Sequence, residues 1–402
     1  MPRLARILLT LAAALAALYA VAVTWKQNER AAGLDFYIYF VGAQIAGRAD
    51  VENIYAAETQ ERIGEEYYER AQRSGSELRK YDATRRRRLD NVSSPFLYTT
   101  LRWVSRDYDR ALRQYHALVL FAFAAGVILI ARRVKVSWAA TLFLLAALLL
   151  WFRGFEADLR VGNVNSLQLL AVAVALWCPP LFAGVVVGML IAFKPNLLLV
   201  ALLPAVSRIA ARDWPRLQRE LAGGAIGVAI AIVAAAVNYG TPRVWLQWIA
   251  AASEFIQRLQ TRTERNVAPA LELFQQYGTA WSYAITLVLA AIACIAILRR
   301  RQADDALVAG VAIAIYLLAA PVVWLHYMLL ALPLAIALLR WRATAVVSLI
   351  ALAAIAEVPF EMLFRTPVYP NDAKLIAPAL IALYACGIWK IAASDARPAA
   401  AL

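Results

Sequence analysis

Long apolar runs recur along the whole chain and are separated by short polar turns. The hydrocarbon core of a bilayer is spanned by about 20 residues of helix, and backbone groups in lipid must bond within their own segment, so each run predicts a helix. The runs near 137, 164, 181 and 196 are short, and we expect some of them to be tilted, broken or merged. The predicted spans are 6–24, 114–131, 137–152, 164–177, 181–193, 196–207, 221–237, 279–298, 305–322, 326–339, 343–357 and 375–391.

The composition assigns the chain to a class of protein. Hydrophobic residues make up 62% of the 402 residues and charged residues only 17%, and the mean hydropathy is +0.60. One soluble core needs far less apolar sequence than this. We therefore predict an all-α polytopic membrane protein with about 12 transmembrane helices, which form a single membrane domain over residues 1–402.

Basic residues mark one end of the predicted spans. Lys and Arg accumulate in short cytoplasmic loops. A twelve-span arrangement puts the basic residues of the short loops and of both termini on one side of the membrane. Both termini are then cytoplasmic, and the chain is expected to lie in the plasma (inner) membrane as a multi-pass protein. The first run has no small-residue cleavage site before the loop, so we interpret it as a retained anchor. The basic residues are Arg3, Arg6, Arg132, Arg133, Lys135, Arg208, Arg212, Arg216, Arg219, Arg299, Arg300, Arg301, Arg340, Arg342, Lys390 and Arg397.

The long connections fall on the opposite, extracytoplasmic face. They are residues 25–113, which form the first extracytoplasmic loop, residues 238–278, which form the second large loop, and residues 358–374. The first loop contains a charged stretch at about 60–92 with four consecutive arginines at 85–88, which a solvated element or one facing lipid headgroups explains. Membrane lipids are therefore expected partners. The net charge of +14 is spread over two faces and no nucleic-acid module is present, so nucleic-acid binding is not expected.

Several chemistries are excluded by what the sequence lacks. The three cysteines have no paired spacing, and two histidines are too few for a histidine-rich metal site, so no metal or other cofactor is expected. The glycines between Gly223 and Gly227 lack the strand and the Lys-Ser/Thr of a phosphate loop. Close helix packing is the better interpretation of these glycines.

Polar residues interrupt the apolar pattern at the predicted outer boundary. Ionisable groups at such depth are costly and tend to face a bundle interior or a water-filled cavity. The structural interpretations of these residues are helix capping for Asp35, a hairpin turn that reaches the interface for Lys194, and packing and capping for His326. Functional alternatives are a point charge for phosphate at Lys194 and a hydrogen-bond donor to a leaving phosphate at His326. The other members of this boundary group are Arg153, Glu156, Asp158, Arg160, Asn163, Asn165, Asn196, Trp324 and Tyr327.

The order of these elements resembles glycosyltransferase family 87, polytopic enzymes typified by the mannosyltransferases of phosphatidylinositol mannoside synthesis. The matching residues cover most of the chain in the order that the family has. They are Asp35, Phe36, Tyr39, Ala43, Gly47, Tyr55, Ser94, Pro95, Phe96, Leu97, Tyr98, Gly162, Asn163, Val164, Asn165, Lys194, Pro195, Pro321, Trp324, His326 and Tyr327.

The resemblance implies a GT-C fold and a sugar donor carried on polyprenyl phosphate. It implies an inverting transfer of a hexose, with mannose favoured, to a lipid-linked or glycan acceptor on the extracytoplasmic face. Asp35 would be the catalytic base that takes the proton of the acceptor hydroxyl, with Glu156 and Asp158 as second candidates. The residues that would bind the donor phosphate or sugar are Lys194, His326, Arg160, Asn163, Asn165, Tyr39 and Tyr327.

Two other functional classes fit the same pattern. A polytopic transporter or lipid flippase of envelope biosynthesis also uses charged groups within the membrane and broken helices, but no internal duplication of the spans is visible. A noncatalytic scaffold subunit for envelope synthesis is the other alternative. It predicts that Asp35 can be replaced without any chemical consequence.

Overall fold

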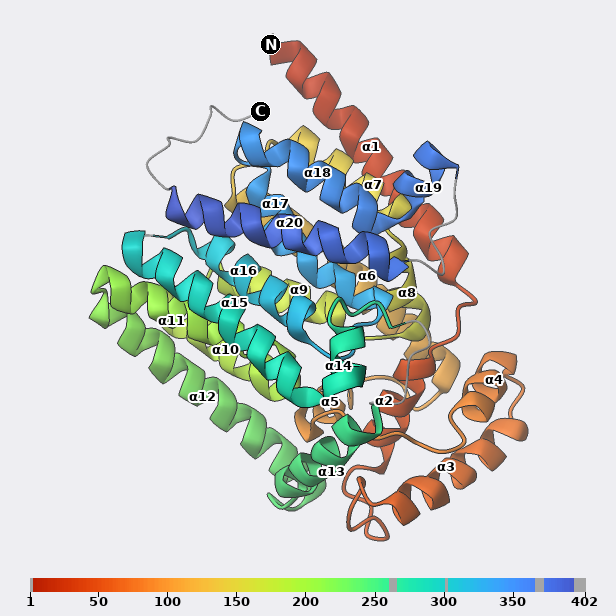
Figure 1. The fold of residues 1–402 in the computed structure, drawn as a ribbon. Helices are drawn as coiled ribbons and strands as arrows, with labels where there is room; N and C mark the ends of the chain where they lie inside the picture. The colour runs from red at the N-terminus through yellow and green to blue at the C-terminus, as the bar shows by residue number, and fades with distance from the viewer. Residues whose placement is uncertain (1–2, 260–265, 301–302, 366–371, 394–402) are drawn as a thin grey trace.

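The computed structural model describes residues 3–259, 266–300, 303–365 and 372–393, and most of these residues are helical (Figure 1). Within this part of the chain the only extended pairs are two isolated bridges, Phe152 with Glu357 and Asn266 with Trp324. Arg301 and Arg397 of the predicted cytoplasmic group lie outside the described residues. So do residues 260–265 and 366–371 of two predicted loops.

The helices follow one another along the chain with short connections. They are α1 (Arg3–Asn28), α2 (Leu34–Ile45), α3 (Ala57–Gln72), α4 (Glu77–Arg85), α5 (Pro95–Thr100), α6 (Tyr108–Arg133), α7 (Trp138–Trp151), α8 (Arg153–Val161), α9 (Asn165–Ala175), α10 (Pro180–Phe193), η1 (Pro195–Leu197), α11 (Leu199–Ala211), α12 (Trp214–Tyr239), α13 (Val244–Leu259), α14 (Leu271–Tyr277), α15 (Thr279–Arg300), α16 (Asp305–Ala319), η2 (Leu325–Ala331), α17 (Leu332–Leu338), α18 (Arg342–Ala356), α19 (Val358–Phe364) and α20 (Asp372–Ala392).

Five of the described helices are long and apolar enough to cross a membrane, namely α1, α6, α12, α15 and most of α20. Shorter apolar helices occupy the other predicted runs, among them α7, α9, α10, α11, α16 and α18. The chain is therefore a multi-pass membrane protein. The total of twelve spans stays a prediction, since the short helices do not reach the length of a full span.

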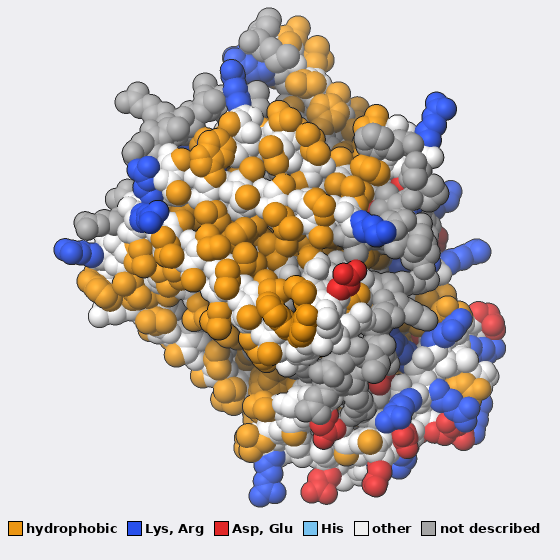
Figure 2. All heavy atoms as spheres, viewed as in Figure 1, with side chains coloured by type: hydrophobic (Ala, Val, Ile, Leu, Met, Phe, Trp, Pro, Cys, Tyr) orange, Lys and Arg blue, Asp and Glu red, His pale blue; other side chains and the backbone are white. Residues whose placement is uncertain are grey.

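The apolar helices form one bundle, and a charged hairpin stands beside it. In Figure 1 the helices α10, α12, α15 and α20 lie side by side, while α3 and α4 project at the lower right, away from both chain ends. Figure 2 shows apolar side chains covering the bundle, while most of the charged side chains on this face gather over α3 and α4. Exposed apolar residues on α12 and α15, such as Val237 at 78% and Leu287 at 70%, are what a lipid-facing surface requires.

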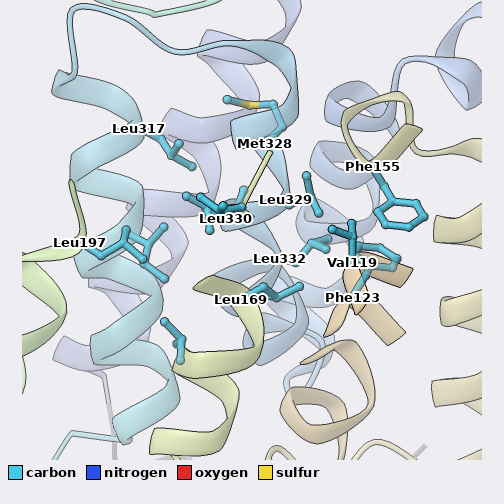
Figure 3. Close-up of a cluster of buried hydrophobic side chains, with 14 of the residues drawn as sticks. Val119, Phe123, Phe155, Leu169, Leu197, Leu317, Met328, Leu329, Leu330 and Leu332 are labelled. Atoms are coloured by element: carbon cyan, nitrogen blue, oxygen red, sulfur yellow. The ribbon is translucent and has the colours of Figure 1, made fainter. Parts of the chain in front are cut away.

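The core lies directly beneath the elements that carry the polar boundary residues. Phe123 of α6 stacks on Phe155 of α8 with ring centroids 3.9 Å apart, and both side chains are fully buried. Figure 3 shows Leu169 of α9 and Leu329 of η2 in the same cluster. Close packing of this kind fixes α8, α9 and η2 relative to one another, so side chains at their ends have defined positions.

Glycines bring α10 and α12 into close contact, as predicted for Gly223 and Gly227. A Cβ atom at Gly223 would collide with the carbonyl of Leu181, and one at Gly227 would collide with that of Val185. Gly188 on α10 faces α12 in the same way. Small residues let two helix backbones approach in lipid, where dispersion contacts rather than water exclusion drive association.

Candidate active site

The predicted boundary residues meet in a cavity of about 1420 Å³. Its walls come from α2, α8, η1, α15, α16, η2 and the segment between α4 and α5. Seven of the eight predicted site residues line it, and Asn165 is the exception. The seven are Asp35, Tyr39, Arg160, Asn163, Lys194, His326 and Tyr327.

Asp35 lies in the first turn of α2 and not at its cap. The cap position is Gly33, and the helix start has no side-chain cap, so the capping interpretation of Asp35 is wrong. The carboxylate is instead held by two long-range partners. Arg86 donates to Oδ1 at 2.8 Å, and the amide of Asn163 donates to Oδ2 at 2.7 Å. The side chain remains 22% exposed at the cavity.

The turn between α8 and α9 brings Asn163 to Asp35. Gly162 ends α8 with φ at +69°, and a Cβ atom there would collide with Phe36, so glycine satisfies both the left-handed backbone and the close approach of α2. Tyr115 donates its hydroxyl to the Asn163 carbonyl at 2.7 Å. The Asn163 side chain is thereby fixed between Asp35 and Lys194.

Lys194 places a half-buried cation beside these groups. The residue precedes Pro195 and has the extended backbone that a following proline favours, which turns the chain sharply between α10 and η1. Its ammonium lies 3.5 Å from Asn163 Oδ1 and 4.5 Å from the ring centroid of Tyr327. With the described residues it forms no ion pair. Burial lowers the pKa of Lys194, because an ammonium loses its hydration there.

His326 and Tyr327 form the opposite wall at the start of η2. The His326 ring meets Tyr327 edge-on with centroids 4.9 Å apart. Its Nε2 atom is buried and has no hydrogen-bond partner among the described residues. A buried polar atom without a partner facing a cavity is a candidate contact for a ligand.

The remaining predicted residues bind partners other than Asp35. Asn165 and Asp158 are fully buried behind the cavity wall, where Asn165 donates to Asp158 at 2.9 Å. Burial raises the pKa of Asp158 to about 6, although hydrogen bonds from Ser166 and Asn165 oppose the shift. Arg160 is 65% exposed at the cavity rim and pairs with Glu156 at 3.5 Å. Tyr39 lines the wall and packs toward Tyr98.

The cavity also contains charged groups that were not predicted from the sequence, among them Arg86 and Glu357. Arg86 was placed in a solvated run, yet it binds Asp35. The run of four arginines begins at the last residue of α4 and continues beyond the helix, and its composition gave no signal that one of them faces inward. Glu357 is 1% exposed, has φ at +64° and lies 3.6 Å from Arg153, which also binds Glu361 through two bonds. Among the described residues no group of three His, Cys, Asp or Glu side chains has the arrangement of a metal site.

The geometry can be compared with known families. The model of glycosyltransferase family 87 matches residues 94–323, more than half of the chain. The chain belongs to glycosyltransferase family 87. It is therefore a glycosyltransferase that uses a sugar donor and an acceptor. No curated protein and no solved structure matches it. The family match includes Asn163 and Lys194 of this glycosyltransferase, whereas Asp35, Arg86 and His326 lie outside the matched residues.

Proposed function

We propose that this family 87 glycosyltransferase transfers a hexose from a polyprenyl-phosphate donor to an acceptor hydroxyl with inversion, and that Asp35 is the general base. The observation that carries the proposal is the placement of Asp35. An oriented carboxylate faces a cavity that also contains a half-buried lysine without an ion-pair partner in the described chain. One group can accept a proton, and the other can meet a developing negative charge.

The chemical step follows from these positions. Asp35 takes the proton of the acceptor hydroxyl while that oxygen bonds to the anomeric carbon of the donor sugar. The bond from that carbon to the phosphate oxygen breaks on the opposite face, and its electron pair stays on the polyprenyl phosphate. A positioned base contributes about 10²- to 10⁴-fold to such a reaction.

Charge on the departing phosphate needs compensation. Lys194 supplies a half-buried cation at the cavity wall, where a fixed charge stabilises a transition state more than it would in bulk water. His326 Nε2 and Asn163 offer further polar contacts for phosphate or sugar oxygens. Arg160 at the exposed rim would meet the phosphate or sugar as it arrives.

We also propose how the donor enters, where the acceptor lies and which fold the enzyme has. The donor reaches the cavity laterally from the bilayer, because its carrier is a lipid, and mannose is the favoured hexose. The acceptor is lipid-linked or a glycan on the extracytoplasmic face of the plasma (inner) membrane. The fold is proposed to be of the GT-C type.

Replacement of Asp35 by Asn tests the assignment of the base. The purified protein in lipid nanodiscs receives radiolabelled polyprenyl-phosphate mannose and a lipid extract as acceptor. Asp35→Asn should lower the transfer rate by at least about 100-fold, since the amide keeps the size but cannot take the proton. Asp50→Asn is the matched control, because Asp50 is a half-exposed carboxylate of the same loop that pairs with Arg48 and Arg62, outside the cavity lining.

Three results would contradict parts of the proposal. Wild-type transfer by Asp35→Asn would remove Asp35 as the base. Loss of transfer in Glu156→Gln instead would move the role to Glu156 at the rim. Movement of labelled donor across sealed vesicles without any transfer would favour a transporter.

A further inference from the structure

The hairpin of α3 and α4 lies outside the apolar bundle but is anchored to the start of α2. Asp82 of α4 is fully buried; it accepts the backbone N–H of Gly33 at 3.0 Å and the hydroxyl proton of Tyr108 at 2.6 Å. Ser76, the cap of α4, donates to Asp109 at 2.5 Å. These contacts fix the end of α4 beside Asp35 without any contribution from an arginine.

Arg86 follows α4 directly and is the one arginine of the run that enters the cavity wall. Its Nε donates to the Leu34 carbonyl at 3.1 Å, and a terminal nitrogen donates to Asp35 Oδ1 at 2.8 Å. The side chain is 23% exposed. The neighbouring arginines face outward: Arg87 pairs with Glu65 and Arg88 with Glu61, and both are more than half exposed.

We infer that Arg86 is a positioning residue for Asp35, an inference that rests on the proposed role of Asp35 as the base. The two donors of the planar guanidinium bind the carboxylate and the backbone one residue before it, so they define the orientation of the side chain against its own helix. Asn163 holds the other oxygen. An ionised carboxylate has about four lone-pair sites, so two bonds leave room for the acceptor hydroxyl.

With Arg86 as a positioning residue, the charged stretch of the first loop has a role in the reaction. The segment from about 60 to 92 was expected to be a solvated or headgroup-facing element, and most of its arginines are exposed. Through Arg86 it contributes directly to the surroundings of the base. Arg86 touches Asp35 and Leu34 and acts on the reaction through the orientation of Asp35.

Steady-state kinetics of Arg86→Met, with Arg87→Met as the matched control, test the inference. Both variants remove a guanidinium that is paired with one carboxylate, and they differ in whether that carboxylate faces the cavity. Arg86→Met should lower kcat about 10- to 100-fold, because a displaced catalytic group can cost about 100-fold, while the KM for the donor stays within about twofold. Arg87→Met should keep both constants.

Arg86→Lys adds a readout that a purely structural role would not give. The ammonium can still pair with Oδ1 but cannot reproduce the two-donor geometry, so kcat should lie between the values of wild type and Arg86→Met. A wild-type kcat in Arg86→Met would overturn the inference. A raised donor KM with unchanged kcat would also overturn it, since Arg86 would then bind the donor.

The failure of this inference is distinguishable from failure of the proposed function. An inactive Asp35→Asn together with a fully active Arg86→Met removes only the role of Arg86. A fully active Asp35→Asn removes the proposed base itself. Each variant is compared with wild type by size-exclusion chromatography and thermal unfolding, so that a folding defect is recognised; the anchors at Asp82 and Ser76 predict that Arg86→Met folds normally.

Discussion

At the scale of single residues, Lys194 is half-buried and forms no direct ion pair within the described chain. Its ammonium has a neutral amide and an aromatic ring as neighbours, and no ion pair with the described residues. Such an arrangement favours an anionic ligand, because the ligand can form the direct ion pair that no side chain of the described chain forms. The consequences can be measured in two ways.

Lys194→Met should lower kcat/KM for the donor about 10- to 100-fold, since a hydrogen bond to a charged group contributes about 1.5–3 kcal/mol. Methionine keeps the length of the side chain and removes the charge. The transfer assay with varied donor concentration measures the change. An unchanged kcat/KM would show that the phosphate binds elsewhere.

The pH dependence follows from the lowered pKa of Lys194. The ammonium is the form that meets phosphate, so its contribution is present below this pKa and is lost as the pH rises through it. The alkaline limb of the kcat/KM profile should therefore begin below about 10.4, the ordinary value for lysine. In Lys194→Arg the limb should move to higher pH, because the guanidinium keeps its proton.

Seven of the eight site residues predicted from the sequence line the cavity, but the pattern could not tell which polar residues of one motif face it. Asn163 and Asn165 are two residues apart in the same motif, and only Asn163 reaches Asp35. Both side chains are buried, but the left-handed turn at Gly162 directs Asn163 toward Asp35 and leaves Asn165 behind the cavity wall, bonded to Asp158. Arg86 was missed because the fold of the hairpin, and not its composition, selects one arginine of four.

At the scale of elements, the sequence located the helices better than their ends. The apolar run 221–237 lies within the longer helix α12 (Trp214–Tyr239), which Asp213 caps and which ends at Gly240 in a left-handed conformation. Apolarity reports only the part of a helix that faces lipid, whereas caps decide where the helix begins and ends. Trp138 and Trp151 bound α7 and are both exposed, in agreement with interfacial tryptophans at the ends of a predicted span.

Two adjacent glycines of α12, Gly223 and Gly224, test the packing of α12 against α10 through the stability of their alanine variants. Gly223→Ala should lower the melting temperature in detergent, since its Cβ would collide with the Leu181 carbonyl and overpacking costs about 1–3 kcal/mol. Gly224→Ala is the matched control: its Cβ would meet only the Gly184 carbonyl, at 3.9 Å. It should leave stability unchanged or raise it by about 0.5–1 kcal/mol, because alanine favours helix. Equal effects of the two variants would contradict the packing.

At the scale of the whole molecule, α12 runs from a cluster of ion pairs at its start to the elements beside the cavity at its end. Near its first turns, Arg216 and Arg208 pair with Asp305 and Glu220. Near its last turn, Asn238 bonds to Thr99 beside the cavity elements. A 26-residue helix is about 39 Å long, so the ion-pair cluster and the cavity lie on opposite sides of the apolar band.

The proposed orientation predicts which end faces outward. Glu77→Cys should react with a membrane-impermeant maleimide in intact cells, since Glu77 has a highly exposed side chain on α4, the helix that Arg86 of the cavity wall follows. Arg219→Cys, exposed near the start of α12, should react only after the membrane is permeabilised. The reverse pattern would place the cavity in the cytoplasm. Both variants are made without Cys178, Cys294 and Cys386, which are partly accessible.

The long-range contacts of Asp35 also set an order for the biosynthesis of the enzyme. Arg86 follows Asp35 by 51 residues and Asn163 by 128, so the ribosome completes the carboxylate well before the side chains that orient it. Lys194 and His326 arrive later still. A nascent or prematurely released chain thus contains the proposed base without its catalytic surroundings, and such chains are expected to be inert toward the donor lipid.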